Sequence, residues 1–139
     1  MDTRTSSGLA LAYRLHDAVN RHDLDSMACC FAIDFVNETP VHPARSFRGR
    51  DQVRKNWAQI FAAVPDLEAE LLGSMTDGEV VWTEWEMRGT RVDNVKHLMR
   101  GVAVFKFGNE QFTSVRFYLE PVDQDGSGVD MAVRKALGQ

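Results

Sequence analysis

The stretch from Val95 to Glu120 constrains the fold more than any other part of this chain. Two runs rich in Val, Phe, Tyr and Leu flank four polar residues, Gly108 to Gln111. Alternating apolar side chains on both sides of a short turn that contains glycine are typical of a β-hairpin. In the first run both faces are mostly apolar, as in a central strand that is covered on two sides. The sequence therefore predicts a hairpin at the centre of a sheet.

The second strand of this hairpin has two different faces. Polar side chains of such a strand commonly face water, while the apolar ones face the core. In the alternative orientation, the apolar face is buried against a second subunit in a dimer. The polar face would then point toward a pocket inside the domain. The residues alone leave both orientations open. Val115, Phe117 and Leu119 lie on one face, and Arg116, Tyr118 and Glu120 lie on the other.

Helical patterns dominate the first half of the chain. Apolar residues follow helical spacing from Ser7 to Val19, and either Asp23 or Asp25 can cap a short second helix. A third helix opens near Asp51 and has the most regular pattern in the chain. Its apolar positions are Val53, Trp57, Ile60, Phe61 and Val64.

Strand patterns occupy most of the remaining sequence. Residues 33–38 read as a short strand, and a loop with two prolines follows it. Residues 67–71 and 80–89 alternate with period two, so with the hairpin they predict a four-strand antiparallel meander. Helices followed by a strongly bent sheet define the α+β class. Such a sheet tends to curl into a cone with an open end, and a mostly apolar cavity of this kind is a usual small-molecule site.

One domain accounts for the chain. Its 139 residues are enough to bury roughly two-thirds of the unfolded surface. We expect residues 1–6 to be disordered and residues 7–122 to form the domain. Residues 123–139 are expected to form a polar link and a short amphipathic helix.

Composition and charge exclude several classes of function. Hydrophobic residues make up 44% of the chain and charged residues 26%, and the net charge of −4 argues against binding of nucleic acid. No apolar run approaches a membrane span and no signal peptide opens the sequence, so we expect a cytoplasmic protein. Cys29 and Cys30 are adjacent, which disfavours a disulfide, and the four histidines lack metal-ligand spacing. Neither a metal nor a cofactor is expected.

Glu120, together with Arg116 and Tyr118, is the main candidate for a catalytic group. A carboxyl group in a dry cavity has a raised pKa that suits it to proton transfer, whereas a neighbouring arginine opposes this shift. Asn37 and Thr39 lie on one side of their strand end and are placed to bind a water or a substrate oxygen, with ordinary turn capping as the alternative.

Further residues are expected to form the wall of the cavity and to contact substrate. The alternative role for each is ordinary core packing, and for His97 it is that of a structural or surface histidine. These candidates are Trp57, Phe61, Trp85, Met87, His97, Met99, Ala103 and Phe105.

Taken together, these features resemble the SnoaL-like branch of the nuclear transport factor 2-like superfamily. The resemblance spans nearly all of residues 9–122 and implies a cone-shaped, cystatin-like fold. In that fold three N-terminal helices pack on a strongly curved, mostly antiparallel sheet. The motifs that carry the resemblance are NRHDLD (20–25), FAIDFV (31–36), FRGRDQV (47–53), VPD (64–66) and RFYLE (116–120).

The resemblance alone does not select an activity, because the fold hosts isomerases, cyclases, epoxide hydrolases and dehydratases. Ketosteroid isomerases need a general-base Asp, an oxyanion-hole Tyr and a protonated Asp. This chain has Thr39, Leu15 and Ala103 at those places, which argues against that chemistry.

The limonene epoxide hydrolase branch is similar at three places. Its water-holding polar pair falls on Asn37 and Thr39, and its water-activating carboxylate falls on Glu120. However, Trp85 and Met87 replace its Arg and its proton-donating Asp. The resemblance therefore lacks the group that protonates the epoxide oxygen.

SnoaL-type polyketide cyclases carry an acid/base residue near the end of the last strand, where Glu120 stands. This resemblance implies that the face with Arg116 and Tyr118 lines the cavity. We expect a homodimer through the outer sheet face, which includes Phe117 and Leu119. The domain is expected to bind an apolar, oxygen-bearing small molecule and to act as a cofactor-independent cyclase, isomerase or epoxide-hydrolase-like enzyme. The alternative is a non-catalytic small-molecule-binding or protein-interaction module.

Overall fold

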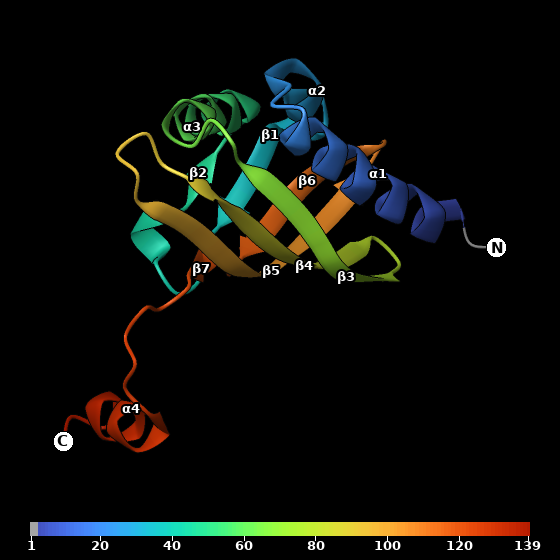
Figure 1. Ribbon diagram of the computed structural model, residues 1–139. Helices are drawn as coiled ribbons and strands as arrows, with labels where there is room; N and C mark the ends of the chain where they lie inside the picture. The colour runs from blue at the N-terminus through green and yellow to red at the C-terminus, as the bar shows by residue number, and fades with distance from the viewer. Residues whose placement is uncertain (1–2) are drawn as a thin grey trace.

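The structure is a computed structural model that describes the backbone of residues 3–139 and the side chains of residues 8–139. The predicted N-terminal helices are α1 (Thr3–Asn20), α2 (Leu24–Cys29) and α3 (Arg50–Ala63). All of them lie on one face of a curved sheet (Figure 1). This arrangement confirms the α+β class and the helix-covered sheet.

In the described part of the chain, seven strands form one sheet with the order β2-β1-β6-β5-β4-β3, and β7 also pairs with β5. Every pairing is antiparallel except that of β1 with β6, which is parallel. A short 3-10 helix, η1 (Pro43–Arg45), precedes β2. The strands are β1 (Phe31–Glu38), β2 (Phe47–Arg48), β3 (Glu68–Asp77), β4 (Val80–Thr90), β5 (Lys96–Gly108), β6 (Gln111–Phe117) and β7 (Glu120–Pro121).

The predicted hairpin consists of β5 and β6. Asn109 and Glu110 form its turn with φ angles of 52° and 61°. Two consecutive positive φ angles are the requirement of the tight hairpin turn that matches strand twist. The predicted meander is confirmed as well, because β3, β4, β5 and β6 are consecutive neighbours in the sheet.

Helix boundaries differ from the prediction by a few residues. Between the two candidate caps of α2 the structure selects Asp23, whose carboxylate accepts hydrogen bonds from the hydroxyl and the backbone N–H of Ser26. These bonds hold the pKa of Asp23 below its usual value. Helix α3 begins at Arg50, one residue before the predicted Asp51.

The N-terminal helix also begins earlier than predicted. Residues 3–6 were expected to be disordered with residues 1–2, but α1 starts at Thr3. Residues 3–6 contain neither proline nor glycine, so nothing in them interrupts a helical backbone. Residues 1–2 lie outside the described residues. The proposed limits of the domain otherwise stay a prediction.

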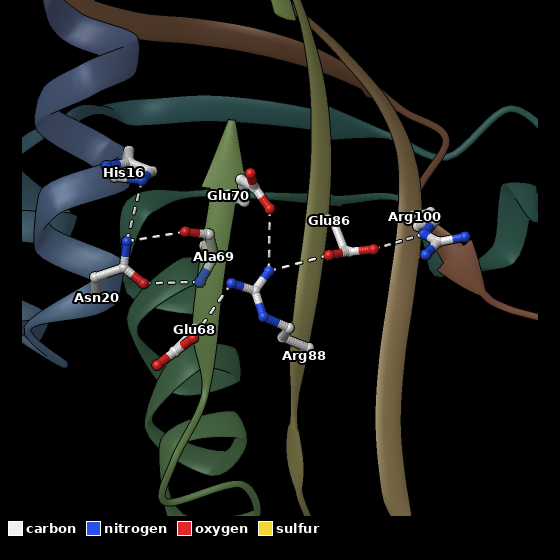
Figure 2. Close-up of polar contacts among 8 residues, drawn as sticks. All are labelled: His16, Asn20, Glu68, Ala69, Glu70, Glu86, Arg88 and Arg100. Atoms are coloured by element: carbon white, nitrogen blue, oxygen red, sulfur yellow. Dashed lines mark hydrogen bonds and ion pairs between the residues drawn. The ribbon is translucent and has the colours of Figure 1, made fainter. Parts of the chain in front are cut away.

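Asn20 ties the last turn of α1 to the edge strand β3. Its Nδ2 donates to the carbonyl oxygen of Ala69 at 2.9 Å, and the N–H of Ala69 donates to its Oδ1 at 2.7 Å. Figure 2 shows this reciprocal pair, together with the bond of 3.1 Å from Asn20 Nδ2 to His16 Nε2. The amide side chain thus pairs with the edge strand as a neighbouring strand would and positions α1 across the sheet.

The outer face of the sheet carries a network of ion pairs across β3, β4 and β5 (Figure 2). Arg88 contacts Glu68, Glu70 and Glu86 at 3.0–3.3 Å, and Arg100 donates to Glu86 at 2.7 Å. The hydrogen bond from Arg100, supported by Arg88, lowers the pKa of Glu86. These charged side chains all lie on the face of the sheet that is turned away from the helices.

Core packing is tight where α1 crosses β4 and β5. An added Cβ on Gly8 would lie 2.7 Å from side-chain atoms of both Val81 and Phe107. No other residue fits at this crossing without displacing those side chains. The internal cavities lie toward the other end of the cone, which carries β2 and β7.

The chain leaves the domain after β7. Helix α4 (Val129–Ala136) forms where the sequence predicts a short amphipathic helix. Figure 1 shows it separated from the sheet and from the other helices. Its large apolar side chains, Val129, Met131 and Val133, are exposed. None of the described helices has the length and apolar character needed to cross a membrane.

Gly101 on β5 lies opposite the interruption between β6 and β7. Its φ angle is +155°, and a Cβ at this position would lie 2.2 Å from the carbonyl oxygen of Tyr118 and 2.7 Å from the Cα of Leu119. Both neighbours are backbone atoms, which cannot rotate away as the end of a side chain can. This close approach is what brings Leu119 and Glu120 back against β5.

We predict that Gly101→Ala lowers the free energy of unfolding by about 3 kcal/mol or more, because the new methyl group forces the last strand away from β5. Urea titration followed by far-UV circular dichroism measures the change. Gly73→Ala in β3 is the matched control, since its Cβ would meet nothing within 4 Å. We expect that control to change stability by less than about 1 kcal/mol. A Gly101→Ala protein as stable as the control contradicts the close approach.

Candidate functional site

Two adjacent chambers lie between the helices and the inner face of the sheet. The inner chamber has a volume of about 70 Å³ and the outer one about 330 Å³. The outer chamber reaches the surface beside β7, and the inner one lies deeper, against α1, α2 and α3. The chambers are adjacent, and both are lined by Asn37, Phe47, Trp57, Phe117 and Leu119.

Polar groups are few and concentrated in the outer chamber. The wall of the inner chamber is apolar apart from Asn37. The outer chamber adds Thr39, Arg45, Asn56 and Glu120 to a wall that is otherwise aromatic and aliphatic. A mostly apolar hollow with a few convergent polar groups is the usual form of a small-molecule site.

Asn37 and Thr39 form a hydrogen-bonded pair at the end of β1. Asn37 lies opposite Val115 of β6 and points to the inner face, where its Nδ2 donates to Thr39 Oγ1 at 3.0 Å. The two residues are only 8% and 6% exposed. The backbone N–H of Thr39 donates to Ser46 Oγ, which fixes the following loop. The Asn37 side chain therefore bonds to another side chain of the chamber wall and does not cap a backbone turn.

Glu120 stands at the rim of the outer chamber and is paired with His42. Its Oε1 lies 2.8 Å from His42 Nε2, and the side chains are 39% and 34% exposed, respectively. Glu120 comes from β7, whereas His42 comes from the loop that precedes η1. His42 itself does not line the outer chamber, so it contacts the Glu120 carboxylate, through Oε1, from outside the chamber wall.

Comparison with known proteins agrees with this architecture. The sequence profile of the SnoaL-like domain matches residues 12–115. The chain belongs to the SnoaL-like family. This confirms the resemblance carried by the sequence motifs. A search of curated protein sequences finds no match to the chain.

Solved structures share the fold of this SnoaL-like domain at low identity. A limonene-epoxide-hydrolase-like epoxide hydrolase of M. tuberculosis is 18% identical, with a TM-score of 0.72 over 84% of each chain. An NTF2-like protein of unknown function from Burkholderia pseudomallei K96243 is 16% identical, with a TM-score of 0.70 over 82% of this chain and 91% of that one. A protein of Shewanella denitrificans OS-217 assigned as a SnoaL-like polyketide cyclase is 15% identical, with a TM-score of 0.67 over 81% and 89%. Identities this low support a common fold and leave activity open.

The orientation predicted for the last long strand of the SnoaL-like domain is wrong. Phe117 lies opposite Ala103 on β5, and paired residues of an antiparallel ladder point to the same side. Phe117 and Leu119 therefore line the chambers. Arg116 and Tyr118, predicted as catalytic residues, point to the opposite face, and Tyr118 is 37% exposed.

This correction also removes the residues that were expected to form a dimer interface. Phe117 and Leu119 cannot belong to the outer sheet face because they are part of the chamber wall. A homodimer through that face stays a prediction, without these two residues.

Glu120 reaches the chamber even though it follows Tyr118 in the strand alternation. It is paired with Arg100 of β5, whose side chain lies in the outer ion network. Glu120, however, belongs to a strand of two residues at the margin of the sheet. Its side chain can turn around this margin, where His42 binds it.

Most of the predicted wall residues line the chambers, and two do not. Phe61 instead stacks on His22, with ring centroids 4.4 Å apart. His97 lies farther along β5, opposite Gly89, where burial lowers its pKa and the charge of Arg91 contributes to the same shift. The residues that line a chamber as predicted are Asn37, Thr39, Trp57, Trp85, Met87, Met99, Ala103 and Phe105.

Sequence reasoning missed several residues of the site. His42 is the most important of them, and the signal available for it was its place between Pro40 and Pro43, which restrict the loop. The others come from helix faces, from β1, β2, β6 and β7, from the link between β6 and β7, and from η1. They are Leu15, Val19, Met27, Phe31, Phe35, Arg45, Phe47, Val53, Asn56, Ile60, Val115, Phe117, Leu119 and Pro121.

The cysteines lie outside the chambers. Cys29 and Cys30 are both free, as predicted. Burial raises the pKa of the Cys30 thiol to about 11, which makes it a poor nucleophile. Among the described side chains, no group of three or more His, Cys, Asp or Glu residues is placed to hold a metal ion.

Trp85 is held in the wall of the inner chamber by a buried hydrogen-bond chain. Its indole Nε1 donates to Thr83 Oγ1 at 2.8 Å, and the hydroxyl of Thr83 donates to the carbonyl oxygen of Ala103 at 2.6 Å. The ring of His16 stacks on the indole with a centroid distance of 6.3 Å. These contacts fix the shape of the chamber wall on the β4 side.

We predict that Thr83→Val destabilises the protein by about 1–3 kcal/mol, because the buried indole N–H of Trp85 loses its acceptor while the side-chain volume is nearly kept. Thermal unfolding and urea titration measure the effect. Thr113→Val is the matched control, because the hydroxyl of Thr113 is exposed and bonds only at 3.3 Å to the Lys106 carbonyl. That control should stay within about 0.5 kcal/mol of wild type. An equally small effect of Thr83→Val would contradict the proposal that the hydrogen bonds from Trp85 through Thr83 to Ala103 stabilise the chamber wall.

Proposed function

We propose that this SnoaL-like domain binds an apolar, oxygen-bearing small molecule in its two chambers and transfers a proton on it without a cofactor. The observation that carries the proposal is the pair formed by Glu120 and His42. It places a single fixed carboxylate at the rim of a chamber whose wall is mostly apolar. A carboxylate positioned beside a bound substrate can act as a general base without a cofactor.

Binding would rest on apolar contact and on one hydrogen-bond site. Trp57, Phe47 and Phe117 belong to the walls of both chambers and offer aromatic surface to a ligand. Thr39 Oγ1 accepts from Asn37, so the hydroxyl proton of Thr39 is directed to another acceptor. A ligand oxygen next to Thr39 would receive this hydrogen bond, and the same bond stabilises negative charge that develops on the oxygen.

The chemistry would be the removal and return of one proton. Glu120 takes a proton from a carbon next to a carbonyl group, and the electrons of the C–H bond move into the carbonyl to form an enolate. The protonated carboxyl group then gives the proton back to another carbon or to the oxygen. His42 would hold Oε1 during both steps and so limit the rotation of the carboxylate. One carboxylate is sufficient for this sequence.

This geometry favours cyclisation or isomerisation over epoxide hydrolysis. Opening an epoxide with water needs a base for the water and a separate acid for the departing oxygen. Among the described residues that line the two chambers, Glu120 is the only carboxylic acid. Trp85 and Met87 stand where the limonene epoxide hydrolase branch would place its Arg and its acid. Arg45 adds a positive charge to the outer chamber, which suits an enolate.

A direct test uses 5-nitrobenzisoxazole as a general probe of a carboxylate base in an apolar pocket. The base removes the ring C–H proton, the N–O bond breaks, and a coloured cyanophenolate forms. We predict that Glu120→Gln lowers the rate of this reaction by about a hundredfold or more. His42→Ala should lower it by a smaller factor, because the carboxylate stays but loses its fixed orientation. Absorbance of the phenolate gives the rate.

Glu84→Gln is the matched control, since Glu84 is an exposed carboxylate on β4 and lines neither chamber. Its rate should equal that of wild type. Trp57 lies in the wall of both chambers, so tryptophan fluorescence reports binding of the probe separately from turnover. Binding without turnover above the Glu120→Gln background would show a non-catalytic binding module, and equal rates for wild type and Glu120→Gln would exclude Glu120 as the base.

A further inference from the structure

We propose that α4 of one chain packs on the outer face of the sheet in a second copy of the chain, and that two copies exchange their C-terminal helices in this way. The receiving surface, called the outer apolar patch, consists of Met75 of β3, Trp82 of β4 and Val102 of β5. This patch lies on the opposite face of the sheet from the two chambers, so the proposal is independent of the proposed function.

Helix α4 is amphipathic, and every residue of the segment 123–139 is exposed. Its apolar side carries Val129, Ala132, Val133 and Ala136, which recur at helical spacing. A helix of eight residues is marginal by itself in water, and most of the stability of such a helix comes from packing of its apolar side. The helix therefore needs a surface that covers this side.

The outer apolar patch combines residues of three neighbouring strands. Val102 lies two residues after Arg100, whose side chain belongs to the outer ion network, so both point outward. Val102 is opposite Glu84 on β4, and Trp82 lies two residues before Glu84 on the same face. Met75 is opposite Trp82, and these two residues are 72% and 47% exposed, respectively. Adjacent exposed apolar side chains, unlike scattered ones, indicate a surface for contact with protein.

Charges at the two ends of α4 complement charges at the two ends of the patch. Asp130 lies in the first turn of the helix, and Arg134 and Lys135 lie in its last turn. On the sheet, exposed Glu84 and exposed Lys106 lie on either side of the Trp82 row, about 13 Å apart along the strands. The helix is about 12 Å long. One orientation therefore brings its basic end to Glu84 and its acidic end to Lys106.

The path of the chain after β7 leads away from the patch of the same copy. β7 runs antiparallel to β5, and the N–H of Val122 then donates to the carbonyl oxygen of Leu98 at 3.0 Å. Trp82 lies opposite Val104, which is about 20 Å from Leu98 in the other direction along β5. The link of residues 123–128 spans about 20 Å when fully extended. It would reach its own patch only by reversing at Val122 and staying straight.

The link is bent, which excludes that path. The N–H of Asp125 donates to the carboxylate of Asp123 at 2.8 Å, and the N–H of Ser127 donates to that of Asp125 at 3.1 Å. Such bonds between residues two apart fold the backbone into local turns. Helix α4 accordingly lies away from its own sheet, on the side that does not carry α1, α2 and α3 (Figure 1). A second copy that presents its outer face from this side meets the helix.

Exchange between two copies covers both surfaces at once. Each copy has one helix and one patch, so a two-fold pair makes the same contact twice. A contact that is not reciprocal would leave a free helix and a free patch in every assembly and would extend it into a chain. The symmetric pair closes after two copies.

Sedimentation velocity over a dilution series tests the exchange, and we expect the wild-type chain to form a dimer. Val133→Asp puts a charge on the apolar side of α4, and Met75→Lys puts one in the patch. Because each change acts twice in a two-fold pair, each should raise the dissociation constant of the dimer by about tenfold or more. Far-UV circular dichroism shows that the variants keep the fold.

Each variant has a matched control. Met131→Asp places the same new charge on α4, but Met131 lies on the side of the helix opposite Val133 and Ala136. Ile33→Lys replaces another exposed apolar residue, on β1, which is separated from β3 in the sheet by β6, β5 and β4. Both controls should dimerise as the wild type does.

A disulfide between copies tests the docking itself. Cys29 is exposed, so the experiment uses a Cys29→Ser background. Met75→Cys and Val133→Cys are made in separate proteins, which are mixed and oxidised, and peptide mapping identifies the linked residues. We expect a covalent product that joins one chain of each kind. Met131→Cys in place of Val133→Cys should give much less of it.

Four results would overturn the proposal. A wild-type chain that stays monomeric at every concentration would exclude the exchange, and so would a dimer that neither Val133→Asp nor Met75→Lys weakens. A dimer weakened by Val133→Asp alone would show that α4 docks elsewhere, for example on the α4 of the other copy. A disulfide that forms within a single chain carrying both cysteines, but not between chains, would show that α4 covers its own sheet.

Discussion

The register between β5 and its two neighbours is the constraint on which the rest of the structure depends. Ala103 lies opposite Thr83 on one side and opposite Phe117 on the other. A shift of one residue would turn every side chain of a strand to the other face. In the observed register the inner faces of β4, β5 and β6 are apolar and line the chambers, while Arg88 and Arg100 stay in the outer ion network. The site exists because this register keeps the apolar side chains on the inner face and the charged side chains on the outer face.

The sequence predicted the fold well because its main signals are local. Turn residues and period-two alternation identify the hairpin, and helical spacing identifies α3. Alternation alone does not reveal which face of a strand meets the helices, and the resemblance to SnoaL-type cyclases then led to the assignment of Arg116 and Tyr118 to the wrong side. The deciding information is which face of the β5–β6 hairpin packs against the helices: Ala103 and its partner Phe117 share a chamber wall with Leu15 of α1. The apolar residues Val115, Phe117 and Leu119 indicate the inward face of this segment better than the polar residues between them do.

The candidate site was predictable only in part, for two physical reasons. In an amphipathic helix, periodicity shows which side faces inward, but it gives no position along the axis of the cone. Trp57 and Phe61 lie on neighbouring turns of α3, yet one lines both chambers and the other stacks on His22. His42 was missed because a loop has no periodicity, and only the folded chain brings it to Glu120.

The two halves of the site differ in their access to water, and this difference matches the tasks we assign to them. Asn37 and Thr39 are buried, so their hydrogen bonds to a ligand oxygen would compete with little water and act at full strength. Glu120 is partly exposed at the rim, so its proton can exchange with solvent between turnovers. A base sealed within the apolar interior would have to return every proton to the substrate, and its charge would be costly to bury. Placing the charged group at the rim and the neutral donors inside avoids that cost while both still face the same bound molecule.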